Sequence, residues 1–237
     1  MKLSNSIFII LIVLSIDQFS KILIKTSMYY GQEELIFGLN WFKINFIENE
    51  GMAWGTVIPG EYGKLILTVI RIFAVCGIGY WMWDSARRDK SHYLMTAIAL
   101  IMAGAIGNII DSVFYGVFFD QSTSTNVATF GSDNPYGTWF HGKVVDMFYL
   151  PIWEGNLPSW LPIWGGKEVR FFNAIFNIAD FAISVGVGIL IVFNKRAFAP
   201  PKLPDHVTFG EMTDEIILAN RRRSREVNPT KDRTFSE

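Results

Sequence analysis

The sequence predicts an all-α membrane protein, a bundle of four transmembrane helices with a small extracytoplasmic β-sheet and an outer loop lying on the membrane. Three observations predict this fold. Half of the 237 residues are hydrophobic and only 18% are charged. Four apolar runs approach or reach the ~20 residues that cross a hydrocarbon layer of ~30 Å. Three of these runs also carry polar residues at helical spacing, which a bundle can turn toward its interior.

The apolar runs place the four helices at about residues 7–26, 64–83, 93–115 and 171–194. The first run follows Lys2 as a signal peptide would, but no small-residue cleavage site lies between Asp17 and Lys21, so we expect a retained helix. The helices form a membrane domain over residues 1–196. Pro, charged and polar residues dominate residues 197–237, which predicts a mostly disordered cytoplasmic tail.

The distribution of basic residues predicts that both termini are cytoplasmic. Arg87, Arg88 and Lys90 lie in the short turn between the second and third helices, and Lys195 and Arg196 follow the fourth. The two long loops, at about 27–63 and 116–170, hold fewer basic residues. By the positive-inside rule these loops face the outside.

The long loops have features of their own. Phe42, Ile44 and Phe46 alternate with polar residues, which predicts a strand with one buried face. Residues 118–142 are rich in Ser, Thr, Asn and Gly and indicate a surface insertion. Residues 149–164 carry several Trp among prolines, a composition typical of a segment at the membrane interface.

Three of the predicted helices carry polar residues spaced three or four apart, and therefore on one helical face. The sets are Asp17 with Lys21, then Asn108 with Asp111 and Ser112, then Asn173 with Asn177, Asp180 and Ser184. A charged residue at the centre of a membrane helix costs ~2.5–3.5 kcal/mol on insertion scales. We therefore expect these sets to meet one another in the outer half of the membrane.

Simpler interpretations exist for most of these residues. Asp17 and Lys21 fit a structural ion pair at i, i+4. Asn108 and Asn177 fit interhelical hydrogen bonding. Asp180 is harder to explain in this way, because a carboxylate in an apolar helix with no basic residue on its own face needs a partner elsewhere.

Five sequence blocks, in this order, resemble those of lipoprotein signal peptidase, also called signal peptidase II. They are DQFSK from Asp17, ENEGMAWG from Glu48, GAIGNIID from Gly104, VVD from Val144 and FNIAD from Phe176. Each block alone is weak, but five in order over residues 17–180 make a specific match. The tail after about Arg196 lies outside the resemblance.

The resemblance implies an aspartic endopeptidase whose catalytic dyad is Asp146 and Asp180. It implies that further residues bind substrate or support the site: Asp17, Lys21, Asn49, Gly51, Asn108, Asp111 and Asn177. The implied substrate is a prolipoprotein with a diacylglyceryl-modified cysteine, cut just before that cysteine. The implied enzyme needs no metal or other cofactor, has no nucleic-acid partner, and works as a monomer among the lipids of the bacterial inner membrane with its site at the outer face.

The chain departs from the family pattern at two places. Ser112 stands where the family most often has Arg, so the positive charge expected near the substrate backbone is absent or comes from another residue. The interval between Asp146 and Asp180 is longer than the family usually shows, and a further insertion lies between Asp111 and Asp146.

Two carboxylates that share a proton can hydrolyse an amide without a metal or a covalent intermediate. The ionised member takes a proton from water and the protonated member acts as an acid. Which aspartate has which role stays open, because such a pair titrates as a unit.

Two other functional classes are compatible with intramembrane carboxylates. A small transporter or proton-relay protein would share them, but broken helices and internal repeats would be expected and neither is evident in the sequence. A metal enzyme could use Asp111, Asp146 and Asp180, yet the three histidines are scattered among a turn, a loop and the tail.

Overall fold

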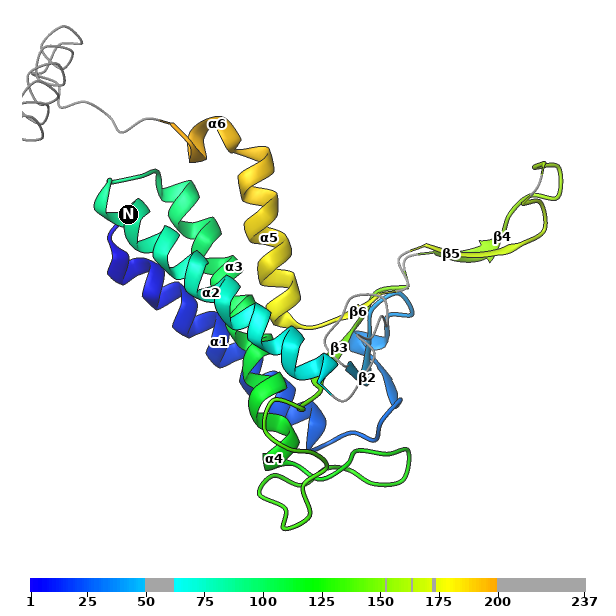
Figure 1. The fold of residues 1–237 in the computed structure, drawn as a ribbon. Coiled ribbons are helices and arrows are strands. Elements are labelled where there is room, and N and C mark those ends of the chain that lie inside the picture. Colours follow the sequence, from blue (N-terminus) through cyan, green and yellow to red (C-terminus); the bar gives the residue numbers. More distant parts are fainter. Residues whose placement is uncertain (50–61, 152, 163, 172–173, 200–237) are drawn as a thin grey trace, which may run out of the picture. The chain divides into compact units, whose positions relative to one another are not determined.

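Three long apolar helices make up most of the fold of the computed structural model (Figure 1). They are α1 (Leu3–Lys25), α2 (Gly63–Arg87) and α3 (His92–Ile110), and α3 continues through a π-helical turn η3 (Asp111–Tyr115) into α4 (Gly116–Phe118). Each is long and apolar enough to cross a membrane. The structure describes residues 1–49, 62–151, 153–162, 164–171 and 174–199, so the predicted tail lies outside the described residues.

The fourth predicted helix is shorter than the sequence pattern indicated. α5 spans Ile178–Val192 and is followed by the short α6 (Asn194–Ala197), whereas the prediction began at residue 171. The helix starts later because Asn177 has an extended backbone and caps it. The predicted polar face that included Asn173 and Asn177 is therefore wrong: Asn177 precedes the helix, and Asn173 lies outside the described residues.

The predicted small sheet is present. It is antiparallel, with the order β1 (Glu33–Leu35), β2 (Lys43–Asn49), β3 (Val144–Tyr149) and β6 (Ile175–Phe176). A 3-10 turn η1 (Ile36–Gly38) follows β1. The predicted strand around Phe46 is β2, and Phe46 is fully buried. A separate hairpin pairs β4 (Trp153–Asn156), which lies inside the segment 149–164 predicted to be at the membrane interface, with β5 (Glu168–Phe171), which follows that segment.

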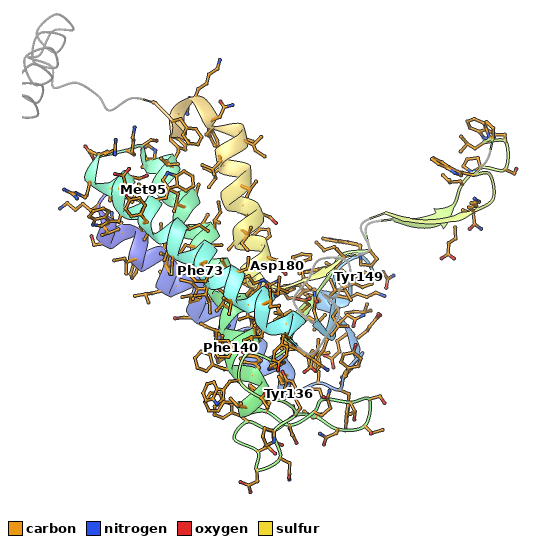
Figure 2. All side chains as sticks on the ribbon, viewed as in Figure 1. Phe73, Met95, Tyr136, Phe140, Tyr149 and Asp180 are labelled. Carbon is orange, nitrogen blue, oxygen red and sulfur yellow. The ribbon has the colours of Figure 1, made fainter. Side chains whose placement is uncertain are left out.

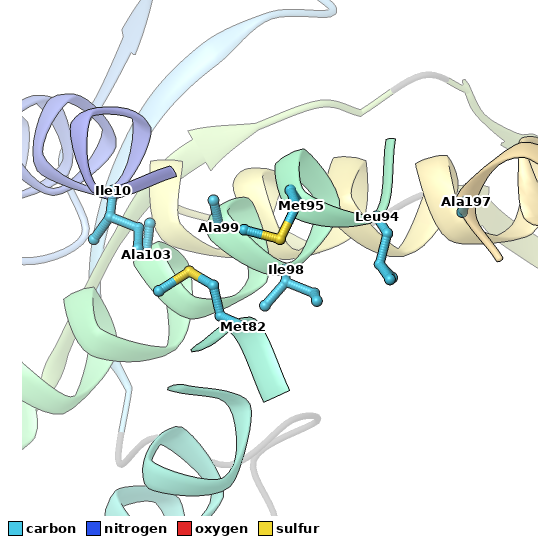
Figure 3. Packing of buried hydrophobic residues seen from close by; sticks show 8 residues of the cluster. All are labelled: Ile10, Met82, Leu94, Met95, Ile98, Ala99, Ala103 and Ala197. Carbon is cyan, nitrogen blue, oxygen red and sulfur yellow. The ribbon is translucent and has the colours of Figure 1, made fainter. Parts of the chain in front are cut away.

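Two apolar clusters hold the described part together. Figure 3 shows the first, where Ile10 of α1, Met82 of α2, Met95 and Ile98 of α3, and Ala197 of α6 pack together. The second joins the ends of α1 and α3 to the sheet; its members include Ile24, Phe46, Tyr115, Phe119, Val145 and Met147. The sheet is thus fixed to the opposite end of the helices from the first cluster.

Two glycines of α3 allow close contact between helices. A Cβ atom on Gly104 would lie 2.2 Å from the carbonyl oxygen of Ala179 in α5. On Gly107 it would lie 2.6 Å from a carboxylate oxygen of Asp17 in α1. Any larger residue would push α5 and α1 away from α3. Both glycines belong to the sequence block that also carries Asn108, so close packing here brings that side chain to its neighbours.

Candidate active site

Asp146 lies in β3 and is 2% exposed. One carboxylate oxygen accepts a hydrogen bond of 2.7 Å from the amide nitrogen of Asn177, and the other accepts one of 3.3 Å from Asn49. Ile47 of β2 pairs with Asp146, so their side chains lie on the same face of the sheet. Asn49 is two residues after Ile47 and shares that face, which lets its side chain reach the Asp146 carboxylate. Burial, and then the charge of Asp180, raise the pKa of Asp146 to about 7.

Asp180 lies in the first turn of α5, where Figure 2 labels it at the junction of helix and sheet. One carboxylate oxygen accepts a hydrogen bond of 2.8 Å from the amide nitrogen of Asn108. The other accepts one of 3.3 Å from the backbone N–H of Asn177. Asp180 is only partly buried, unlike Asp146, so the pair is accessible from its side.

Asn177 holds the two aspartates in one arrangement. Its side-chain oxygen accepts a hydrogen bond of 2.9 Å from the backbone N–H of Asp180, which completes a capping box. Because the oxygen is used there, the amide nitrogen is the group that faces Asp146 and the carbonyl oxygen of Val145. A single fully buried residue therefore connects the start of α5 to β3.

Lys21 pairs with two buried carboxylates beneath this pair. Its ammonium group lies 2.9 Å from a carboxylate oxygen of Asp17 and 2.9 Å from one of Asp111, and it donates a hydrogen bond of 2.9 Å to the side-chain oxygen of Asn108. An ammonium group can only donate. The Asn108 oxygen must therefore face Lys21, which leaves its amide nitrogen to bind Asp180.

Asp17 and Asp111 each bind the backbone N–H of the residue that precedes one aspartate of the pair. Asp17 accepts a hydrogen bond of 2.9 Å from the backbone N–H of Ala179, and Asp111 accepts one of 3.2 Å from that of Val145. Gln18 donates to both carboxylates, at 3.1 Å and 2.9 Å. Asp17 and Asp111 thus have a supporting geometry.

The geometry is a pair of carboxylates from two elements, held by asparagines above one buried lysine. A family model described as signal peptidase (SPase) II matches residues 9–195 of this chain. The chain belongs to the signal peptidase II family.

Curated relatives agree with this family assignment. A lipoprotein signal peptidase of Porphyromonas gingivalis is 46% identical over 190 residues, which cover 79% of this chain and 81% of the relative. One of Amoebophilus asiaticus is 35% identical over 218 residues, covering 90% and 86%. A solved structure described as a bacterial membrane enzyme has a TM-score of 0.54 at 25% identity, and covers 86% of this chain and 95% of that one. Members of the signal peptidase II family are proteases, so this chain is a protease.

Within this signal peptidase II chain, the structure brings together most residues that the sequence singled out. Asp17, Lys21, Asn49, Asn108, Asp111, Asn177 and the two aspartates of the pair form one connected network. Gly51 lies outside the described residues. Ser112 is buried, and its hydroxyl donates a hydrogen bond of 2.9 Å to the Asn108 carbonyl in its own helix, so it brings no charge to the site.

The sequence analysis missed a second buried cation, Lys25. Its ammonium group pairs with Glu48, donates a hydrogen bond of 3.0 Å to Ser122, and lies 5.2 Å and 4.9 Å from the ring centres of Phe119 and Tyr136. These contacts attach the inserted segment to α1 and to β2. A sequence signal was available, because Lys25 extends the spacing of four residues from Asp17 and Lys21.

An apolar groove of about 360 Å³ is formed by residues close in sequence to both aspartates, together with two aromatic residues that precede β2. It is lined by Trp41, Phe42, Phe148, Leu150, Phe176, Ile178 and Phe181. The rings of Phe148 and Phe176 pack at 6.0 Å across β3 and β6. Because β3 carries Asp146 and α5 carries Asp180, an apolar molecule in this groove would lie close to the pair.

Proposed function

We propose that this chain is an aspartic endopeptidase that removes signal peptides from diacylglyceryl-modified lipoprotein precursors, with Asp146 and Asp180 as its catalytic dyad. The observation that carries the proposal is the placement of two carboxylates from separate elements on either side of Asn177. No basic side chain forms an ion pair with either aspartate among the described residues, so the pair is not a simple salt bridge. Such a pair is suited to proton exchange with a water molecule.

The substrate class follows from the relatives and fits the groove. The relatives from Porphyromonas and Amoebophilus are lipoprotein signal peptidases. A precursor of this kind presents a hydrophobic signal peptide and a lipid chain next to the bond that is cut. The apolar lining of the groove can accept one of these parts while the peptide bond lies at the dyad. The proposed cut is just before the lipidated cysteine.

The first test is direct cleavage. The full-length chain, purified in detergent, is incubated with a diacylglyceryl-modified precursor in the presence of a metal chelator, and the products are identified by mass spectrometry. We expect a single cut on the amino side of the modified cysteine, at the same rate with and without chelator. The unmodified precursor serves as the control and should be cut far more slowly. No cleavage, a cut at another bond, or cleavage that the chelator stops would contradict the proposal.

We also propose that the protein resides in the bacterial inner membrane with both termini cytoplasmic and the dyad at the outer face. The basic residues at Arg87, Arg88 and Lys90, at the far end of α2 from the sheet, support this orientation. The supporting observation for membrane insertion is that outward side chains of the helices are large and apolar, such as Phe19, Phe73 and Ile191. We expect the enzyme to act as a monomer.

Cysteine labelling tests this orientation. The exposed native Cys76 is first replaced by Ser, and single cysteines are then placed at Ser132 in the insertion and at Ser224 in the tail. An impermeant thiol reagent applied to spheroplasts should label Ser132→Cys and not Ser224→Cys. Both should react after the membrane is permeabilised, which controls for access. Labelling of Ser224→Cys in intact spheroplasts would reverse the proposed orientation.

A further inference from the structure

The strands β2 and β3 present two different faces, because successive residues of a strand point to opposite sides of a sheet. Asn49 and Asp146 meet on one of these, which we call the dyad face. Phe46 and Glu48 of β2 point to the opposite or back face, where Phe46 is fully buried. Whatever packs against the back face therefore sets where these strands hold the residues of the dyad face.

The insertion, residues 118–142, packs against this back face together with the end of α1. Phe119 and Ala128 of the insertion belong to the same apolar cluster as Ile24 and Met28 from the end of α1, and Phe46 is a member of it. This part of the insertion thus lies behind the strand pair, on the side away from the dyad face.

A buried ion pair lies within this packing, between Lys25 of α1 and Glu48 of β2, whose side chains are 0% and 1% exposed. Ser122 of the insertion donates a hydrogen bond of 3.0 Å to the same Glu48 oxygen and accepts one of 3.0 Å from Lys25. We call these three residues the back-face cluster. Among the described residues the other Glu48 oxygen has no hydrogen-bond partner, so the cluster alone holds this carboxylate. Because lost hydration offsets much of the attraction in a buried pair, stability alone does not account for it.

Tyr136 connects the back-face cluster to the start of β3. Its ring, labelled in Figure 2, has its centre 4.9 Å from the Lys25 ammonium group. Its hydroxyl accepts a hydrogen bond of 2.7 Å from the backbone N–H of Lys143, the residue before β3. The cluster and the insertion therefore hold the end of β2 and the start of β3 together.

Glu48 directly precedes the residue that binds Asp146. The amide nitrogen of Asn49 donates to the Asp146 carboxylate at 3.3 Å. This distance is at the long end of the range for such a bond, so a small displacement breaks it. Since adjacent strand residues point to opposite faces, fixing Glu48 on the back face keeps Asn49 on the dyad face.

We propose that the back-face cluster positions Asn49 against Asp146, so that the insertion supports the dyad from behind the sheet. The inference rests on the proposed function. It makes Lys25, Glu48 and Ser122 positioning residues of the protease, and it gives a role to a segment for which the sequence predicted only a surface insertion.

The proposal predicts which kinetic constant depends on the cluster. Asp146 has both carboxylate oxygens held, one by Asn177 at 2.7 Å and the other by Asn49 at 3.3 Å. Without the second bond the carboxyl can turn out of line with the scissile peptide, and small misplacements of a reacting group lower the rate of the chemical step. The apolar groove does not use this hydrogen bond, so KM should change little.

The test is a double-mutant cycle on the cleavage of a lipidated precursor by the full-length chain, with kcat expressed per folded protein. Lys25→Met combined with Glu48→Leu removes both buried charges together, so this pair variant should fold. We expect it to lower kcat about tenfold with KM within about twofold, and Asn49→Ala to do the same. Adding Asn49→Ala to the pair variant should lower kcat by less than about twofold more, because both changes act through one contact.

Two further variants complete the experiment. Ser122→Ala removes one hydroxyl and no charge; it should lower kcat about threefold, and this loss should vanish in the Asn49→Ala background. It decides the question by itself where the pair variant gives too little folded protein. Lys43→Met breaks an exposed ion pair at the other end of β2 and should leave kcat unchanged.

The outcomes separate the role of the cluster from the proposed function. Losses that multiply to about a hundredfold when the pair variant and Asn49→Ala are combined would overturn the positioning role. An unchanged kcat in Asn49→Ala, or in both the pair variant and Ser122→Ala, would also overturn it. In each of these cases cleavage by the wild-type protein upholds the proposed function. Absence of cleavage by the wild-type protein would overturn both.

Discussion

We expect Asp146→Asn and Asp180→Asn each to lower the turnover of a lipidated precursor by at least about 10²–10⁴-fold, the contribution typical of general acid–base catalysis. Asn has nearly the size of Asp and can keep the hydrogen bonds from Asn177 and Asn108, but it cannot accept and return a proton near neutral pH. The double variant should be little worse than either single variant. Residues that act as one unit show this non-additivity, whereas independent contributions would multiply.

The thermal stability of Asp146→Asn provides a control for folding with a predicted sign. The pKa of Asp146 is raised to about 7, so the folded protein favours the protonated, neutral carboxyl. The contribution of this carboxyl to the free energy of unfolding is therefore fully present below the ordinary Asp pKa of ~3.9, and it is lost as the pH rises toward 7. Asn is neutral at every pH and loses nothing. The Tm of Asp146→Asn relative to wild type should therefore be higher at pH 8 than at pH 5.

Asp84→Asn is a suitable activity control. Asp84 forms an exposed pair with Arg88 at the other end of α2, at 2.9 Å, and should be replaceable with full activity. Substantial proteolysis by folded Asp146→Asn or Asp180→Asn would remove that residue from the dyad. If both variants retained activity, the aspartic mechanism would have to be abandoned.

Much of this site could be predicted because polar and charged side chains cost free energy inside a membrane helix, so their presence there indicates that they meet one another. Asp17 and Lys21 at i, i+4 predicted an ion pair, and the pair is present. Asn108 and Asp111 fall on α3 and its π-helical extension as their spacing indicated. The boundary of the fourth helix was missed because an apolar run has the same appearance whether it is helix or buried strand. Only the pairing of Ile175 and Phe176 with β3 shows that these two residues form a strand and not the start of the helix.

Contacts that depend on tertiary structure were beyond the sequence pattern. Glu48 and Ser122 gave no sign that they would meet Lys25, because each comes from a loop or strand far away in the chain. The capping role of Asn177 was also missed, because the spacing of this residue from Asp180 fits a helical face equally well.

Lys21→Met is expected to cost about 3–5 kcal/mol of folding free energy, the range seen when one member of a buried ion pair is removed. The side chain is fully buried and forms ion pairs with Asp17 and Asp111, which are 1% and 0% exposed. Its loss leaves two uncompensated buried carboxylates. It also frees the Asn108 amide to rotate, so the activity of the protein that does fold should fall as well. Denaturant unfolding in mild detergent measures the first effect and precursor cleavage the second.

Lys43→Met is the matched comparison, since Lys43 and Glu33 form an ion pair of 3.3 Å whose side chains are 24% and 44% exposed. That change should cost less than about 1 kcal/mol, because water screens an exposed pair. Combining Lys21→Met with Asp17→Asn and Asp111→Asn should recover much of the lost stability, as the buried charges are removed together. The recovered protein should still cleave poorly, because Asn108 lacks the donor that orients it. Equal stability of Lys21→Met and Lys43→Met would show that the cluster does not support the site.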